Sequence, residues 1–321
     1  MNTNTIDKKN KASIKLSEYR SSGRESHVFR AEHPEGLIGA HADLIAASLN
    51  LGEKIHYLLY SPIREAGYAP FGIHAEPASH ALAVTDHRFL ISKDRHIDKI
   101  PPTVQDIPFS QVICIEIGSA LLLGWLAVRF IENGQLSCAS LFYTARGSHH
   151  FEAAVREFRK RHGKTQNYLY EGGMTWTDLW EQTPKPQADI LKSIILEEEK
   201  PAYLFHSTET WGMETRRRKE ICLAAEGVFL ATDYGFIHAS DERRISPHIL
   251  SYGVNVRCVP PGALYSLAHI EKEEHRLCLH ILRMYAGIPP AIVDIDIPFD
   301  RDRSDRVEDF ICAMIQNKIE G

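Results

Sequence analysis

The 321-residue chain has no long apolar run, and this bears on how it could meet a membrane. Its most apolar window, Ile117 to Ile131, is shorter than the roughly 20 residues that a membrane-spanning helix needs, and Gly118 and Ser119 interrupt it. The first residues hold no apolar core of the kind that a signal peptide has. We therefore expect a cytoplasmic protein with no transmembrane segment.

Motifs of catalysis and metal binding are lacking as well. The six cysteines show no C-x-x-C spacing, and the 17 histidines show no H-E-x-x-H pattern. The sequence also has no G-x-S-x-G nucleophile elbow, no phosphate-binding glycine loop and no dinucleotide fingerprint. We therefore predict no catalytic residue, no cofactor and no metal site. The histidines, His238 among them, are expected to be exposed or hydrogen-bonded, and the cysteines to be mostly small core residues.

A strong charge of either sign is also missing. The formal net charge is −5 and the isoelectric point is near 6.4, so nothing attracts the chain to nucleic acid in general, and we expect no nucleic-acid partner. The chain is 44% hydrophobic and 25% charged, as is usual for a globular protein, and its length suits about two domains.

One pattern is present twice. H-A-L-A-V-T-D-H-R-F-L-I-S-K-D, His80 to Asp94, aligns without a gap on G-V-F-L-A-T-D-Y-G-F-I-H-A-S-D, Gly227 to Asp241. Each copy predicts a strand, a tight turn and a returning strand. The polar corners are structural turn residues in this interpretation, with each Asp bonding to the backbone of its own turn; they are Thr85, Asp86, Thr232 and Asp233.

A second pair of segments extends the repeat. G-E-K-I-H-Y-L-L-Y-S, Gly52 to Ser61, matches E-E-K-P-A-Y-L-F-H-S, Glu198 to Ser207, at a shift of 146 residues, against 147 at the T-D corners. A period of this size is that of a whole domain rather than of a solenoid repeat. We therefore predict an internal duplication, with a disordered basic tail at 1–33, a first domain at 34–164, a linker at 165–187 and a second domain at 188–321.

Several local features fill in this plan. We expect a helix from Leu37 to about Gly52, and turns at Gly118-Ser119 and Asn133-Gly134. Each domain should end in an amphipathic helix, capped by Ser148 in the first and by Ser304 in the second. The buried stripe of the second helix is predicted to be Val307, Phe310, Ile311, Met314, Ile315 and Ile319.

The linker holds Trp176 and Trp180, four residues apart. On one helical turn they would face the same way. We interpret them as interdomain packing residues, with a ligand cage as the alternative.

The order of these elements resembles the bacterial pleckstrin-homology-like domains and their GRAM-type relatives. The resemblance rests on A-V-T-D-H-R-F-L-I-S, I-P-F-S-Q-V-I-C-I-E-I and the Ser148 helix, and then on F-L-A-T-D-Y-G-F-I-H-A-S, I-S-P-H-I-L-S-Y and the Ser304 helix. It implies an α+β fold of two tandem PH-like β-barrels or pairs of orthogonal sheets. These would be mainly antiparallel, and each would be closed by its C-terminal amphipathic helix.

Two charged clusters are candidate sites. In eukaryotic relatives of this fold, basic residues near the first strand–strand loop bind inositol-phosphate head groups, which suggests a phosphate or anionic-lipid site here at Arg216, Arg217, Arg218 and Lys219. Glu214 and Glu220 flank this cluster, so a solvated charged face is the favoured alternative. Asp294 and Asp296 alternate with apolar residues and should share one strand face, as a metal site or, as we favour, a solvated face.

These patterns favour a non-enzymatic binding or scaffold protein whose partner is another protein or a second copy of itself. A peripheral module that binds anionic lipid is one alternative. An enzyme with its active site between the repeats is another, because clefts often form there.

Overall fold

The computed structural model describes residues 27–62, 67–68, 74–75, 78–95, 100–164, 175–214, 219–241, 253–274 and 277–320. Within them every strand pairing is antiparallel, and helices flank the sheets, so the chain has the predicted α+β fold. No helix in these ranges has the length and apolar character to cross a bilayer.

The first half consists of a leading helix, two groups of strands and a closing helix. After β1 (Phe29–Arg30) come α2 (His41–Ser48), β2 (Ile55–Ser61), β3 (Gly67–Tyr68), β4 (His74–Ala75), β5 (Ser79–Thr85), β6 (Arg88–Asp94), β7 (Thr103–Pro108), β8 (Val112–Ala120), β9 (Leu123–Glu132), β10 (Gln135–Thr144) and α3 (Ser148–His162).

The second half repeats this order. It runs α4 (Trp176–Gln182), α5 (Lys185–Ile194), β11 (Pro201–Ser207), β12 (Thr210–Glu214), β13 (Lys219–Ala224), β14 (Gly227–Thr232), β15 (Gly235–Asp241), β16 (Gly253–Val259), β17 (Leu264–Glu274), β18 (Leu277–Ile288), β19 (Ala291–Phe299) and α6 (Ser304–Glu320). Both copies of the T-D pattern are therefore hairpins, β5–β6 and β14–β15. The exact domain boundaries stay a prediction, although α5 already runs across the one proposed at residue 188.

The two halves share one sheet. Its strand order is β10-β9-β8-β16-β15-β14-β11, and the junction is the antiparallel pair β8–β16, in which Ile117 lies opposite Val256. A five-stranded sheet, β1-β2-β5-β6-β7, and a three-stranded sheet, β17-β18-β19, complete the main framework. None of these sheets closes on itself within the described residues, so of the two expected arrangements the β-barrels are wrong and the pairs of orthogonal sheets stay a prediction. The halves are fused by backbone hydrogen bonds between β8 and β16.

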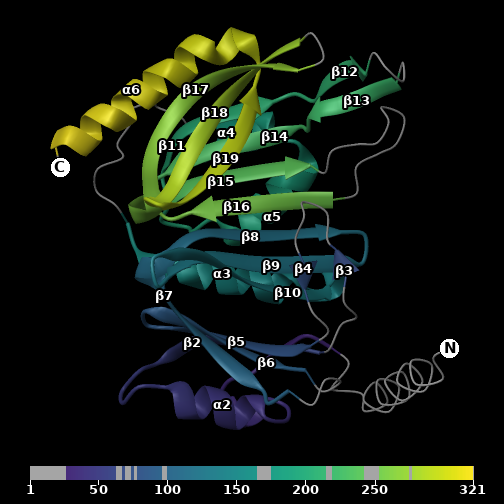
Figure 1. The fold of residues 1–321 in the computed structure, drawn as a ribbon, viewed down its shortest axis with the longest axis vertical. Coiled ribbons are helices and arrows are strands. Elements are labelled where there is room, and N and C mark those ends of the chain that lie inside the picture. The colour runs from purple at the N-terminus through teal and green to yellow at the C-terminus, as the bar shows by residue number, and fades with distance from the viewer. Residues whose placement is uncertain are drawn as a thin grey trace.

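In Figure 1 the five-stranded sheet (the lower sheet) lies at the bottom of the view and the seven-stranded sheet (the middle sheet) lies above it. The three-stranded sheet (the upper sheet) overlaps the upper strands of the middle sheet in this view. Apolar side chains fill both interfaces of the middle sheet. One core joins it to the lower sheet, α3 and α5, and the other joins it to the upper sheet and α6. Because both faces of the middle sheet are buried, its strands show near-continuous apolar runs.

The closing helices bury the stripes that their periodicity predicts. Phe151 of α3 stacks on Tyr143, with ring centroids 3.8 Å apart, and Phe310 of α6 stacks on Tyr203 at 4.4 Å. In α6 the predicted stripe holds for Val307, Phe310, Ile311 and Met314 but not for Ile315, which is exposed; the side chain of Ile319 lies outside the described residues. The chain enters α3 and α6 through 3-10 turns, so Ser148 and Ser304 are the first helical residues rather than the caps.

One predicted turn is misplaced. β8 continues through Gly118 and Ser119, and the chain reverses at Leu121, which has a φ of 54°, and Leu122. Gly118 stays in the strand because the Trp125 ring lies across it; a Cβ there would lie 2.4 Å from that ring. The turn at Asn133 and Gly134 is confirmed, with positive φ at both residues.

The cysteines also depart from expectation. Cys114 and Cys258 are buried, but Cys138, Cys278 and Cys312 are exposed, so most are not core residues.

Candidate functional site

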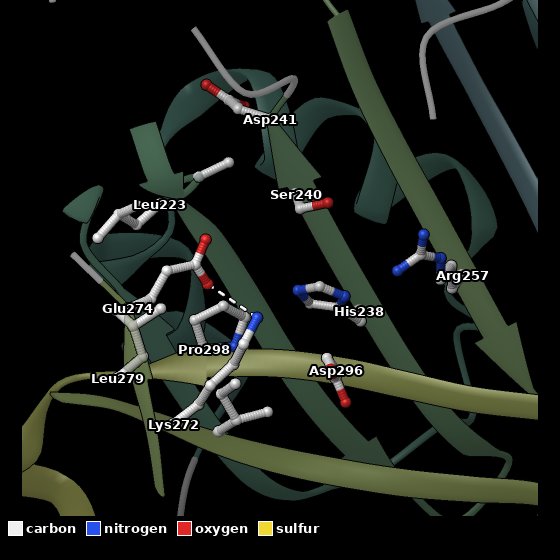
Figure 2. Close-up of a pocket in the computed structure, with 12 residues that line it drawn as sticks. Leu223, His238, Ser240, Asp241, Arg257, Lys272, Glu274, Leu279, Asp296 and Pro298 are labelled. Carbon is white, nitrogen blue, oxygen red and sulfur yellow. Dashed lines mark ion pairs between the residues drawn. The ribbon is translucent and has the colours of Figure 1, made fainter. Parts of the chain in front are cut away.

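A pocket of about 400 Å³ lies in the second half, where the three-stranded sheet faces β15, β16 and the end of β13 (Figure 2). Its apolar part comes from Leu223, Leu279 and Ile281, and its polar part includes His238, Ser240, Asp241, Arg257, Lys272, Glu274 and Asp296. Ligand pockets in proteins commonly have volumes of about 300–1,000 Å³ and combine apolar walls with a few polar groups. This pocket has that character.

His238 lies at its centre, between Arg257 and Glu274 in the view of Figure 2. Strand alternation puts it there, because Ile237 and Ala239 point into the opposite core and His238 must then face the pocket. The residue is 4% exposed, and its Nδ1 atom has no hydrogen-bond partner. The expectation of an exposed or hydrogen-bonded histidine is therefore wrong for His238.

Burial, reinforced by the positive charge of Arg257, lowers the pKa of His238 to about 3. The ring is thus neutral near pH 7. A neutral imidazole offers one donor and one acceptor nitrogen, so the buried Nδ1 atom can bond to a polar group that enters the pocket.

Arg257 belongs to a charge network that crosses the junction between the halves. The Glu116 carboxylate on β8 accepts from Arg129 Nε at 2.6 Å and from Arg257 Nε at 3.4 Å. Two guanidinium groups share one buried carboxylate, so this group of three carries a net positive charge at the pocket wall. The Arg257 fork is suited to a carboxylate or another anionic oxygen.

Three other charged residues of the pocket are already in ion pairs. Lys272 Nζ lies 2.8 Å from Glu274 Oε2, the pair marked by the dashed line in Figure 2. Asp296 accepts two hydrogen bonds from Arg283, at 2.6 and 2.8 Å, and Asp294 lies 3.7 Å from the same guanidinium. The V-D-I-D-I carboxylates are thus exposed on one strand face, as the favoured interpretation of a solvated face predicts, and both lie close to Arg283.

No known protein-family model matches this chain, and no curated protein matches it either.

The side chains of the predicted basic cluster, Arg216 to Lys219, are not among the described residues. Arg216, Arg217 and Arg218 lie outside the described residues, and Lys219 is placed only by its backbone, at the start of β13. A phosphate or anionic-lipid site there stays a prediction.

The T-D corners form turns as predicted, but the threonines rather than the aspartates hydrogen-bond to the backbone of the turn. Thr85 Oγ1 accepts from the Arg88 N–H at 3.2 Å, and Thr232 Oγ1 accepts from the Tyr234 N–H at 3.0 Å, so the threonines satisfy the turns.

The aspartates reach across to the neighbouring strand. Asp86 accepts from the Lys54 N–H at 2.9 Å, and Asp233 accepts from the Lys200 N–H at 2.8 Å. Each Asp therefore anchors the residue just before β2 or β11, which fixes the register of that strand against the hairpin.

Trp176 and Trp180 lie on α4 and face the same way, with ring centroids 5.7 Å apart and planes 14° apart. Both are partly buried against the lower core, which contains residues of both halves. Trp176 Nε1 donates to the Glu199 carbonyl at 2.9 Å, so α4 is attached to the segment leading into β11.

Sequence reasoning missed His238 and Arg257 as site residues. The signal that could have found them is a polar residue that alternates with buried apolar residues along a strand: His238 in G-F-I-H-A-S and Arg257 in G-V-N-V-R-C-V. Each is ordinary by itself, and only the packing of the upper sheet over both makes a pocket.

Proposed function

We propose that this chain is a non-enzymatic binding protein of two pleckstrin-homology-like halves, and that the pocket of its second half binds a carboxylate-bearing ligand. The observation that carries this is the buried, unpartnered Nδ1 atom of His238 in the same pocket as Arg257.

The succession of elements supports the pleckstrin-homology-like assignment. Each half has four strands in one sheet, β2-β5-β6-β7 or β11-β14-β15-β16, followed by three consecutive strands and one closing helix. The closing helices plug the apolar interior between their strands, as the resemblance implies.

The state of the ionisable groups supports binding rather than acid–base chemistry. A general base or acid works best with a pKa near the working pH, and the pKa of His238, at about 3, is far below neutrality. Lys272 and Asp296 are each engaged in an ion pair. What the pocket offers is hydrogen bonding and, on the wall formed by Arg257, Arg129 and Glu116, a local positive charge.

This arrangement suits a carboxylate. One carboxylate oxygen can accept from the guanidinium of Arg257, on which only Nε is engaged by Glu116 among the described contacts. A second polar group of the ligand can bond to His238 Nδ1. The carboxylate could belong to a free small acid or to an acidic side chain or C-terminus of a partner protein, as the expectation of a protein partner suggests.

Calorimetric titration of the full chain tests this, with succinate and free glutamate as small acids and an acetylated peptide ending in glutamate as the protein mimic. We expect the wild type to bind at least one probe, and the His238→Leu and Arg257→Gln variants to bind it at least tenfold more weakly. Tight binding of the peptide alone would identify a protein as the source of the carboxylate.

His80→Leu is the matched control. His80 is also buried, with an unpartnered Nδ1 atom, but it lies in β5 of the first half, away from the pocket. It should bind like the wild type. If no probe binds, or if His238→Leu binds as well as the wild type, the proposal is wrong.

A further inference from the structure

A second cluster lies on the opposite face of the upper sheet. His269 and Glu271 are two residues apart on β17 and therefore share a face. His280, on β18, is directly opposite Glu271 and diagonal to His269. The same face carries Leu267 and Leu282 into the core beneath α6, so the cluster sits where this core meets solvent.

The nitrogen and oxygen atoms of the cluster converge. His269 Nε2 lies 3.2 Å from His280 Nδ1, and His280 Nδ1 lies 3.6 Å from Glu271 Oε1. The candidate ligand atoms of all three residues lie within 4.8 Å of one another. Ligand atoms about 2.0–2.2 Å from a tetrahedral zinc ion are roughly 3.3 Å apart, so small side-chain shifts would place all three around one ion.

The surroundings orient the two rings. His269 Nδ1 lies 3.0 Å from Glu308 Oε1 on α6, where it donates its hydrogen and leaves the Nε2 lone pair directed into the cluster. A carboxylate that holds the second nitrogen of a ligating histidine is a regular part of zinc sites. Phe299 packs against both imidazoles, with ring centroids 5.1 Å from His269 and 5.8 Å from His280.

The burial also suits an ion that enters from solvent. The side chains of His269 and His280 are 15% and 8% exposed, whereas Glu271 is 63% exposed. The imidazoles are therefore held in place, and the carboxylate can close over an ion from the open side.

We propose that His269, Glu271 and His280 bind one divalent transition-metal ion, zinc by preference, and that Glu308 is a positioning residue for His269. Imidazole ligands favour zinc, copper and nickel over magnesium and calcium, which prefer oxygen. Bound metal would clamp β17 to β18 and, through Glu308, to α6. The expectation of no metal site came from spacing along the chain, whereas these ligands meet across a strand pair.

The test is calorimetric titration of chelator-treated full chain with ZnCl₂ and with MgCl₂, together with the melting temperature. We expect the wild type to bind zinc, to have a higher melting temperature when zinc is bound, and not to bind magnesium. His269→Ala and His280→Ala should each lose one equivalent of zinc or bind it at least 100-fold more weakly. Glu308→Gln should bind it about tenfold more weakly.

The control is His206→Ala. His206 Nε2 forms a similar histidine–carboxylate pair, 3.0 Å from Glu226 Oε1, but takes no part in this cluster. It should bind zinc like the wild type. Glu271→Gln changes an exposed side chain and should fold even if a histidine variant does not; it should weaken zinc binding and the visible absorption of tetrahedral Co²⁺. The proposal is overturned if the wild type binds no zinc, or if the histidine and Glu271 variants bind it as the wild type does.

Discussion

Glu199, at the start of the second half, binds the guanidinium group of Arg159, which belongs to the helix that closes the first half. Arg159 Nη1 donates to Glu199 Oε2 at 2.9 Å, a second bond joins Nη2 to Oε1, and both side chains are almost completely buried. In the first half the equivalent Glu53 pairs with Arg88 of its own hairpin. The second copy has Gly235 where Arg88 would be, so an arginine from the other half fills that role.

Arg159→Ala should destabilise the whole chain. It leaves Glu199 buried without its counter-charge, and breaking a buried pair in this way costs about 3–5 kcal/mol of unfolding free energy. Denaturant unfolding measures this. Arg156→Ala, which removes an exposed pair with Glu197 from the same helix, should cost less than about 1 kcal/mol. Equal losses in the two variants would show that the Arg159 pair does not hold the halves together.

Glu53→Gln should remove part of the acid sensitivity. The Arg88 hydrogen bond, opposed by burial, lowers the pKa of Glu53 from 4.5 to about 2. Because the folded-state pKa is depressed, this group stabilises the fold above about pH 4.5, and the stabilisation is lost as the pH falls toward 2. Urea unfolding between pH 5 and pH 2.5 should therefore show a shallower loss for the variant than for the exposed control Glu197→Gln. Parallel curves would contradict the assignment.

His238→Leu should stabilise the unliganded protein. At pH 7 it removes a buried polar atom without a partner, a feature that costs about 1–3 kcal/mol. The advantage should grow by about 2 kcal/mol at pH 5, because the pKa of His238 is 6.5 unfolded and about 3 folded, so only the unfolded wild type takes up this proton as the pH falls through that window. Unfolding at the two pH values measures the difference; a constant difference would mean that the folded ring is not held neutral.

Gly235→Ala should be among the more damaging small substitutions. Gly235 has a φ of 114°, and a Cβ there would lie 2.4 Å from the Val259 carbonyl oxygen across the strand pair. We expect a loss of more than about 2 kcal/mol in unfolding free energy. Gly134→Ala also places a side chain at positive φ, but in open space, and should cost only about 1 kcal/mol. Similar losses of unfolding free energy in the two variants would show that the backbone around β16 can shift to make room for the added Cβ.

Much of the element order was predictable because the same pattern of apolar runs and turn residues occurs twice in the sequence. The T-D hairpins, the Asn133-Gly134 turn and the apolar stripes of both closing helices follow from local turn chemistry and periodicity. The turn predicted at Gly118 is wrong because the sequence does not distinguish a glycine that packs against a tryptophan ring from a glycine that forms a turn. The predicted serine caps are wrong because a 3-10 turn precedes each helix, so that Ser148 and Ser304 are already its first residues.

The candidate sites were less predictable, because their residues are far apart in the chain. His238 and Arg257 meet as neighbours on adjacent strands, and the upper sheet covers them. His269 and His280 become neighbours only through the β17–β18 register. Neither relationship leaves a fixed spacing that a motif could express.

The sequence by itself determined the two T-D hairpins and the helix that follows each group of strands, since hydrophobic periodicity and turn residues act over short distances. Only the tertiary structure decided that the copies share a sheet through β8 and β16, and that Arg159 of one copy neutralises Glu199 of the other. The physical reason is that a strand edge can pair with any edge of matching register and a buried charge with any counter-charge in reach. Which partner each one takes depends on how the whole chain packs.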